Sequence, residues 1–271
     1  MHASIRLGVS TAPLFPRPLG EIFQILQKQP LREIELMPQS PAECRPDFAR
    51  ELLSHGREGF HFCSIHFPLI LHPFLYNPYP SAREYGRELC RGLAALAARL
   101  ESQVLVVHAP SRKMGTSPFI EVAAENIAYL CDLCAPSGIQ VGLENSPNSP
   151  AETPHQMQEW AARINRPNLG FVLDVTHARQ SNLDPLDFIR TLPSLVHFHV
   201  SDYHPQNGPH QPIGLGKVDW RRLAGALHRS RFEGYVVLEL ATSTVGEDPA
   251  VTLRESVSRL SAWLDIDRGE Q

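Results

Sequence analysis

Eight short apolar runs alternate with amphipathic segments along this chain, and the alternation limits its folds more than any other feature. The runs cover residues 5–10, 33–37, 60–66, 104–108, 140–144, 170–174, 195–200 and 235–239. The segments between and after them repeat apolar side chains at helical spacing, over residues 19–29, 46–55, 82–100, 118–135, 154–164, 185–191, 220–230 and 249–264. Eight strand–helix units in 271 residues predict an α/β fold, a single (β/α)8 TIM barrel.

Some of the runs are apolar at successive positions, as at residues 104–107 and 236–238. Continuous apolar runs are typical of strands buried on both faces of a parallel sheet, in a barrel or in a doubly wound open sheet. The open sheet is the alternative fold. The chain has neither a linker rich in glycine and serine nor a shift in composition, so we expect one domain over residues 1–271.

The charge balance and the N-terminal residues disfavour several classes of protein. The chain has 25 Lys and Arg against 29 Asp and Glu, without a basic run longer than two residues, which disfavours broad neutralisation of nucleic acid phosphates. No stretch approaches the roughly 20 apolar residues of a membrane helix. The first residues lack the pattern of a secretory signal. We therefore expect a cytoplasmic protein without a membrane partner.

The five cysteines are scattered, and only Cys131 and Cys134 form a CxxC motif. This pair lies inside a predicted helix, and no second pair is present to complete a zinc site. We interpret both as buried apolar residues.

The ends of the predicted strands carry the chemistry of this chain. In a barrel, the carboxyl ends of all strands meet on the face where active sites lie. Six consecutive runs have, at their carboxyl end, a side chain able to bind a metal: His66, His108, Glu144, Asp174, His199 and Glu239. Imidazoles and carboxylates without a thiolate favour zinc or manganese, with cobalt, iron and magnesium as further candidates. The sequence therefore predicts a divalent metal ion at this face.

These residues also have simpler structural interpretations. A single histidine at a strand end is more often a hydrogen-bonded structural residue than a ligand. The carboxylates differ, because an unpaired charge inside a barrel costs several kcal/mol, and a bound metal removes that cost. On the seventh run, His199 ranks first as a ligand, and His197, two residues deeper, is interpreted as a core histidine.

Four segments together resemble a known family. They are Val141-Gly142-Leu143-Glu144-Asn145, Gly170-Phe171-Val172-Leu173-Asp174-Val175-Thr176-His177, His197-Phe198-His199-Val200-Ser201-Asp202 and His210-Gln211-Pro212-Ile213-Gly214-Leu215-Gly216-Lys217-Val218-Asp219-Trp220. This ordered series resembles the xylose isomerase-like superfamily of TIM barrels. The superfamily includes sugar isomerases and epimerases, and AP endonucleases of the endonuclease IV type. The resemblance extends from the third run to the eighth.

The resemblance implies roles for the strand-end residues. The shared ligands of a divalent metal would be Glu144, Asp174, His199 and Glu239. The nuclease branch uses three zinc ions, and its further ligands correspond to His66, His108, His177 and His210. Gly208 departs from that branch, because it replaces an aspartate and the third zinc would lose a carboxylate. The arginine that ketose 3-epimerases usually carry in the loop after strand seven is absent near Pro205.

The first hypothesis is a divalent-metal-dependent isomerase or epimerase of a small sugar, free or phosphorylated. Glu144 and Glu239 would exchange the roles of general base and general acid around a metal-stabilised enediolate. The side chains expected to bind substrate are His177, His210, Lys217 and Arg179. For Lys217 and Arg179, a solvent-exposed loop cation is the simpler interpretation.

The second hypothesis is a zinc-dependent phosphodiesterase acting on DNA, as an AP endonuclease does. It requires basic loop residues beside the metals, and the available ones are Arg112, Lys113, Arg179 and Lys217. The net negative charge and Gly208 place this hypothesis second. A binding protein that has lost catalysis comes third, because the set of ligands is intact. A homo-oligomer is compatible with each.

Three further features have interpretations of their own. Residues 67–80, rich in proline and aromatic side chains, would form a hydrophobic lid or pack across the barrel top. Asp219 is interpreted as the N-cap of the helix that follows it. Glu35, near the end of the second run, is interpreted as pairing with a neighbouring cation, with substrate contact as the alternative.

Overall fold

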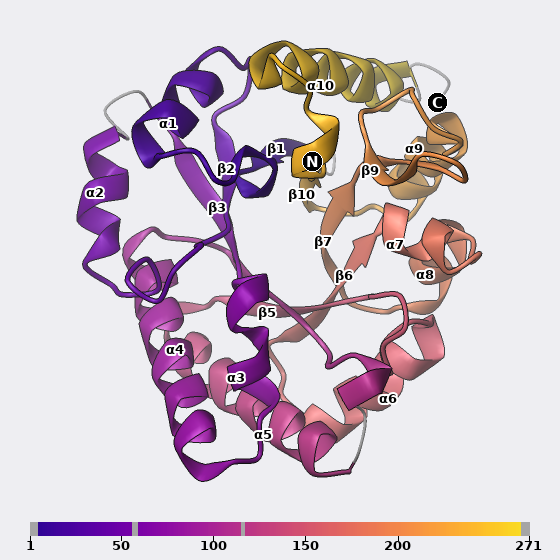
Figure 1. Ribbon diagram of the computed structural model, residues 1–271. Helices are drawn as coiled ribbons and strands as arrows, with labels where there is room; N and C mark the ends of the chain where they lie inside the picture. The colour runs from indigo at the N-terminus through magenta and orange to yellow at the C-terminus, as the bar shows by residue number, and fades with distance from the viewer. Residues whose placement is uncertain (1–4, 56–58, 115–116, 267–271) are drawn as a thin grey trace.

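The computed structural model describes residues 5–55, 59–114 and 117–266. Eight parallel strands form a closed barrel in the order β1, β10, β7, β6, β5, β4, β3, β2 (Figure 1). They are β1 (Ile5–Ser10), β2 (Glu33–Leu36), β3 (His61–His66), β4 (Val104–His108), β5 (Gln140–Glu144), β6 (Leu169–Asp174), β7 (Leu195–Val200) and β10 (Gly234–Leu238). Because β1 pairs with both β10 and β2, the sheet has no open edge. The TIM barrel prediction is confirmed and the open-sheet alternative is wrong.

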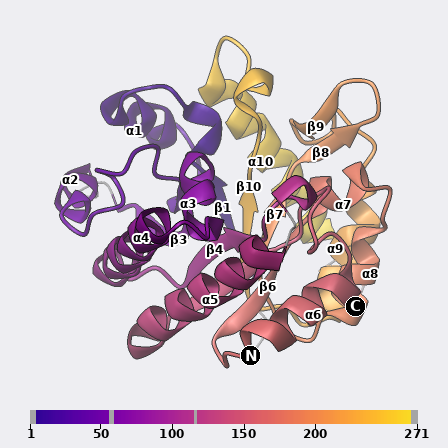
Figure 2. The ribbon, with the colours of Figure 1, turned by 60° about the horizontal axis from the view of Figure 1, so that its bottom comes forward.

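The long helices surround the barrel and cover its outer face (Figures 1 and 2). They are α1 (Leu19–Gln27), α2 (Phe48–His55), α4 (Pro80–Arg99), α5 (Ser117–Cys134), α6 (Pro154–Ile164), α8 (Pro185–Thr191), α9 (Trp220–Arg229) and α10 (Pro249–Ile266). Each predicted helical segment forms a helix, with ends that shift by a few residues. Asp219 caps α9 as expected, because its side chain accepts a hydrogen bond from the Arg222 amide at 3.0 Å.

Four short elements follow the carboxyl ends of strands, and the sequence analysis did not predict them. They are the helices α3 (His72–Tyr76) and α7 (Val175–Gln180) and the antiparallel strands β8 (Asp202–His204) and β9 (Gly208–Gln211). Figure 2 shows the β8–β9 ribbon standing out beyond the end of β7. The elements enclose the face of the barrel to which the strand-end residues belong.

The segment 67–80, which contains α3, packs against the barrel through part of its length. Phe67 and Tyr76 are buried, and the Tyr76 hydroxyl donates a hydrogen bond to the His108 carbonyl at 2.7 Å. Ile70 and Tyr79, in contrast, are 70% and 68% exposed. Packing across the barrel top accounts for the buried residues, and closure of the exposed ones as a lid stays a prediction.

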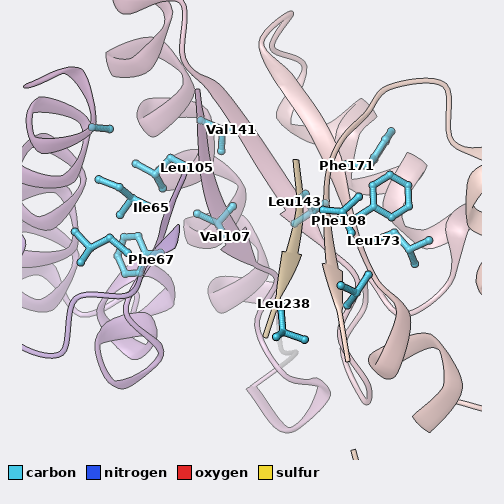
Figure 3. Close-up of a cluster of buried hydrophobic side chains, with 14 of the residues drawn as sticks. Ile65, Phe67, Leu105, Val107, Val141, Leu143, Phe171, Leu173, Phe198 and Leu238 are labelled. Carbon is cyan, nitrogen blue, oxygen red and sulfur yellow. The ribbon is translucent and has the colours of Figure 1, made fainter. Parts of the chain in front are cut away.

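Strand periodicity decides which residues face the inside of the barrel. Side chains alternate between the two faces of a strand, so Leu105 and Val107 of β4 and Leu143 of β5 pack outward in the core beneath the helices (Figure 3). Val104 and Val106 form a separate inner cluster with Val172. The same alternation turns the last residues of β4, β5 and β6 inward.

Gly142, on the inner face of β5, allows the barrel wall to close below these residues. A Cβ atom at this position would lie 2.5 Å from Val172 Cγ2 and 3.2 Å from Val104 Cγ1. Overpacking of this kind costs typically about 1–3 kcal/mol, so we expect Gly142→Ala to lower the free energy of unfolding by that amount in urea denaturation. Gly20→Ala in α1 is the control, because no atom beyond its chain neighbours and the backbone of its own helix lies within 4 Å of its Cβ position. Equal stabilities of the two variants would contradict this account.

The cysteines behave as the sequence analysis expects. All five are free and buried. Burial raises the pKa of Cys131 and of Cys134 to about 12, so both remain protonated thiols at neutral pH. In the part of the chain that the structure describes, no helix is both long enough and apolar enough to span a membrane.

Candidate metal centre and active site

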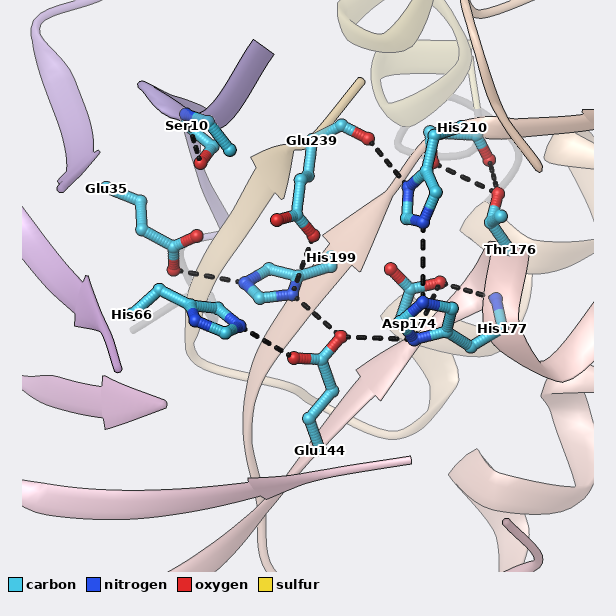
Figure 4. Close-up of polar contacts among 12 residues, drawn as sticks. Ser10, Glu35, His66, Glu144, Asp174, Thr176, His177, His199, His210 and Glu239 are labelled. Carbon is cyan, nitrogen blue, oxygen red and sulfur yellow. Dashed lines mark hydrogen bonds and ion pairs between the residues drawn. The ribbon is translucent and has the colours of Figure 1, made fainter. Parts of the chain in front are cut away.

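The structure brings the strand-end side chains together at the carboxyl end of the barrel (Figure 4). His66, Glu144, Asp174 and His199 are fully or almost fully buried, and Glu239 lies one residue beyond β10 with 11% of its side chain exposed. Each belongs to a different strand or its end, so the cluster exists only because the barrel closes. These are the positions at which TIM barrels place their active sites.

The central group consists of four residues whose ligand atoms all lie within 4.8 Å of one another: Glu144, Asp174, His199 and Glu239. His199 Nδ1 lies 3.1 Å from Glu144 Oε1 and 3.2 Å from Glu239 Oε2. Asp174 Oδ1 accepts a hydrogen bond from the His177 amide at 2.6 Å and thereby caps α7. This group is the one that the sequence analysis expects to hold a metal.

Three further groups adjoin the central one and share its carboxylates, and one of them consists of His66, His199 and Glu239. The other two bring in additional histidines. His66, His108 and Glu144 form the first, in which His108 Nε2 lies 2.7 Å from Glu144 Oε2 and 3.1 Å from His66 Nε2. Asp174, His177 and His210 form the second, in which the Nε2 atoms of the two histidines are 3.3 Å apart. Gly208 begins β9 and adds no carboxylate to it. All four additional histidines are therefore placed beside the predicted ligands.

Backbone carbonyls fix the orientation of three of these imidazoles. Nδ1 of His66 faces the Phe67 carbonyl at 2.7 Å, Nδ1 of His177 faces the Asn145 carbonyl at 3.0 Å, and Nδ1 of His210 faces the Glu239 carbonyl at 3.2 Å. A carbonyl oxygen only accepts hydrogen bonds, so each Nδ1 carries the proton. In the neutral rings, Nε2 therefore presents its lone pair to the cluster, as a metal-binding histidine requires.

The central group contains buried polar atoms that make no hydrogen bond of regular geometry. Glu144 Oε1, Asp174 Oδ2 and His199 Nδ1 are buried without a hydrogen-bond partner. Buried polar atoms are normally hydrogen-bonded, and several converging oxygen and nitrogen atoms without such bonds fit a divalent cation. The residues present therefore fit the metal that the resemblance implies.

The pKa shifts within the cluster also indicate a site that can bind a cation. Burial alone would raise the pKa of Glu144, but His108 and His199 hold it well below the usual value. Burial opposes the charged form of His177, yet Asp174 and Glu144 raise the pKa of that histidine to about 9. The neighbouring imidazoles thus keep Glu144 ionised, and their protons compensate its charge. A cation that binds here must displace such protons.

A search of protein families gives a match over residues 22–263 to the model described as xylose isomerase-like TIM barrel. The chain belongs to this family. The match covers most of the chain, and it includes each of the strand-end residues from His66 to Glu239.

The sequence of this xylose isomerase-like barrel is similar to those of proteins that carry different names. Over 168 residues it is 26% identical to the uncharacterized protein MJ1311 of Methanocaldococcus jannaschii, covering 58% of this chain and 57% of that protein. Over 123 residues it is 28% identical to a ketose 3-epimerase of Arthrobacter globiformis, covering 44% of this chain and 41% of that enzyme. The matches thus span less than two thirds of either relative.

Solved structures extend the similarity of fold to the whole barrel. The crystal structure of a D-tagatose 3-epimerase-like protein superimposes with a TM-score of 0.81 and 21% identity, covering 98% of this chain and 99% of that one. Other solved structures that share the fold are those of enzymes named as sugar epimerases.

A cavity of about 310 Å³ opens beside the centre of the xylose isomerase-like barrel and includes His108 in its wall. Its further polar lining residues are His72, Tyr76, Ser111, Ser146 and Ser149, and the other lining residues are apolar. Arg179 and Lys217, in contrast, line another pocket of about 240 Å³, whose walls include none of the strand-end residues. Arg112 is paired with Glu152 at 3.0 Å. The structure therefore places Arg179 and Lys217, which were expected to bind substrate, beside each other but apart from the cluster.

The sequence analysis missed His72 and predicted the partner of Glu35 only in part. His72 of α3 is buried, with its ring centroid 5.2 Å from that of His108 and its Nε2 unpaired. The sequence shows no helical periodicity around His72, because α3 is too short to produce such a pattern. Glu35 was assigned a neighbouring cation, and its partners are two imidazoles of β7, His197 and His199. His197 is fully buried, as expected of a core histidine.

Proposed function

We propose that this protein is a divalent-metal-dependent isomerase or epimerase that acts on a small sugar. The observation that carries the proposal is the convergence of buried, unpaired ligand atoms of Glu144, Asp174 and His199 with Glu239 at the mouth of the barrel. The similarity to a protein named ketose 3-epimerase supports the choice of substrate class.

Glu144, Asp174, His199 and Glu239 would hold the metal, with zinc or manganese first and cobalt, iron or magnesium as alternatives. A bound divalent cation would supply positive charge to neighbouring carbonyl and hydroxyl oxygens, and so favour the enediolate left when an α-proton departs. His177 and His210 lie at the edge of the cluster, where they would contact substrate oxygens.

Proton transfer would fall to the two glutamates. Glu239 is the better placed to reach a substrate, since 11% of its side chain is exposed. Glu144 is fully buried, and the neighbouring rings of His108 and His177 are each 14% exposed. In the proposed reaction, one carboxylate removes the α-proton and the other returns a proton to the same or the neighbouring carbon.

The cavity beside His108 would receive the remainder of the substrate. Ser111 in its lining could form hydrogen bonds with a sugar hydroxyl, and its apolar walls would contact carbon atoms of the sugar. No charged side chain other than a histidine appears in its described lining. We therefore favour an uncharged sugar over a sugar phosphate.

Solvent deuterium exchange tests the proposal whichever product the reaction forms. Chelator-treated protein is reconstituted with zinc, manganese or cobalt and incubated in D2O with a panel of ketoses and aldoses. We expect deuterium to appear at the carbon next to the carbonyl of at least one sugar, observed by NMR, and only in a metal-loaded form. Absence of exchange for every sugar and every metal would overturn the proposal.

A phosphodiesterase acting on DNA is the second candidate, and the two additional ligand groups favour it. Against it, Arg112 is engaged by Glu152, and Arg179 and Lys217 lie in a separate pocket. Incubation of the zinc-loaded protein with a duplex containing one abasic site tests it directly. Strand cleavage together with a null deuterium exchange would reverse the order of the two candidates.

A further inference from the structure

Glu35 is a fully buried carboxylate at the candidate metal centre, and the proposed function gives it no role. It extends from β2 to β7, where its Oε2 accepts hydrogen bonds from His197 Nε2 at 3.1 Å and His199 Nε2 at 3.0 Å. Ser64 of β3 donates to the same oxygen at 2.8 Å. Figure 4 shows Glu35 on one side of the His199 ring, with Glu144 and Glu239 near its other nitrogen.

The barrel provides the room for this contact. β2 and β7 are not neighbours, because β1 and β10 lie between them on one side. The residues in register with Glu35 on the adjacent strands are Ser10 and Ser64, and both are small. A long carboxylate flanked by two short side chains can therefore reach across the interior to a strand with which β2 does not pair.

The hydrogen bond from His199 determines which nitrogen is available to a metal. An ionised carboxylate only accepts, so Nε2 carries the proton. In the neutral ring, Nδ1 then holds the lone pair, and this atom lies 3.1 Å from Glu144 Oε1 and 3.2 Å from Glu239 Oε2. A carboxylate behind a histidine ligand fixes both its tautomer and its rotation.

We propose that Glu35 is a positioning residue of the metal centre: it holds His199 with Nδ1 directed into the group of Glu144, Asp174 and Glu239, and so strengthens metal binding. The inference rests on the proposed metal-dependent function. It concerns a residue that would not touch the metal or the substrate.

An alternative arrangement uses the same atoms differently. Glu35, His197 and His199 also lie close enough together to hold a cation of their own. A cation there would occupy Nε2 of both histidines and displace the hydrogen bonds that Glu35 now accepts. The observed separations of 3.0 and 3.1 Å and the additional donor Ser64 favour the hydrogen-bonded arrangement. In the hydrogen-bonded arrangement, Glu35 changes the affinity for a metal held by other residues. In the alternative arrangement, Glu35 is itself a ligand, and its loss removes one metal ion.

The test compares Glu35→Gln with Glu33→Gln. Glu33 begins the same strand and contacts His61 Nδ1 at 2.6 Å, so the control removes the charge of a Glu–His pair outside the centre. Affinity for Co²⁺ and Zn²⁺ is measured by competition with a chromophoric chelator, and the visible spectrum of the Co²⁺ form reports ligand geometry. Substrate is not needed.

We expect Glu35→Gln to weaken metal binding by about 10–100-fold, to change the Co²⁺ spectrum and to keep the wild-type stoichiometry at saturation. Glu33→Gln should stay within about twofold of wild type. Wild-type affinity and spectrum in Glu35→Gln would overturn the proposal. Loss of one whole metal equivalent, with unchanged binding of the rest, would also overturn it in favour of a cation at Glu35.

Ser64→Ala provides a second test if circular dichroism shows that Glu35→Gln does not fold. It retains the charge but removes a donor that holds the carboxylate, so a several-fold weaker affinity is expected, and wild-type affinity would overturn the proposal. Because every readout is metal binding, a protein without isomerase activity would refute the proposed function and leave the result for Glu35 intact.

Discussion

Replacement of Glu144 by glutamine is expected to lower the deuterium exchange rate of the metal-loaded protein by about 10³-fold or more, and to lower its metal content as well. Glu144 is shared by two ligand groups: its Oε2 faces His66 and His108, and its Oε1 faces His199. Glutamine keeps the shape but removes the charge, and it turns one oxygen into an amide nitrogen that repels a cation. Exchange rate and metals per chain by elemental analysis are the two measurements.

Glu152→Gln is the matched control for this variant. Glu152 follows β5 in the same loop and is also hydrogen-bonded, to Ser181 at 2.8 Å and to Arg112 at 3.0 Å, but it belongs to none of the ligand groups. It should retain its metal and its exchange rate. Full metal content and full exchange in Glu144→Gln would show that this carboxylate is neither a ligand nor an acid–base group.

Glu239→Gln tests whether the chain holds more than one metal ion. Glu239 belongs to the central group and to a group with His66 and His199, but not to the one formed by His66, His108 and Glu144. A second metal ion held by His66, His108 and Glu144 should therefore be lost through Glu144→Gln and kept through Glu239→Gln. Equal losses would indicate one metal ion per chain.

The fold and most of the cluster could be predicted because both depend on local pattern. A continuous apolar run identifies a buried strand, and alternation then decides that Glu144 and Asp174, as last residues of β5 and β6, face inward with Gly142 and Val172. Closure of the barrel brings such residues together without any further information. The prediction of these ligands therefore depended only on locating the strand ends correctly.

The features that sequence reasoning missed depend on contacts across the barrel or on short loop elements. The partners of Glu35 lie 162 and 164 residues away, on a strand that β2 does not pair with, and no spacing rule connects them. His72 lies on a five-residue helix between proline-rich turns, and this helix is too short to show apolar periodicity. Arg179 is two residues from His177 on α7, and a helix turns about 100° per residue, so Arg179 lines a separate pocket while His177 faces Asp174 and His210.

Chelation of the metal is expected to lower the unfolding temperature of the protein by about 8–16 °C. A ligand present at about 1,000 times its dissociation constant stabilises the folded state by about 4 kcal/mol, and each kcal/mol shifts the midpoint by roughly 2–4 °C in a domain of somewhat smaller size. The structural reason lies in the cluster itself. Without a cation, buried atoms of Glu144, Asp174 and His199 lack hydrogen-bond partners. Scanning calorimetry with and without chelator, at fixed pH and ionic strength, measures the shift.

Glu144→Gln decides whether this shift arises at the cluster. The variant should already have lost most of its metal, and one of its buried carboxylate charges is gone, so chelator should change its midpoint by only about 2 °C. Glu152→Gln should shift like the wild type, because its side chain stabilises a loop away from the ligand groups. An equal shift in all three proteins would place the stabilising cation elsewhere. No shift in the wild type would mean that the carboxylates are compensated by imidazole protons alone, which would remove the physical basis for a metal-dependent reaction.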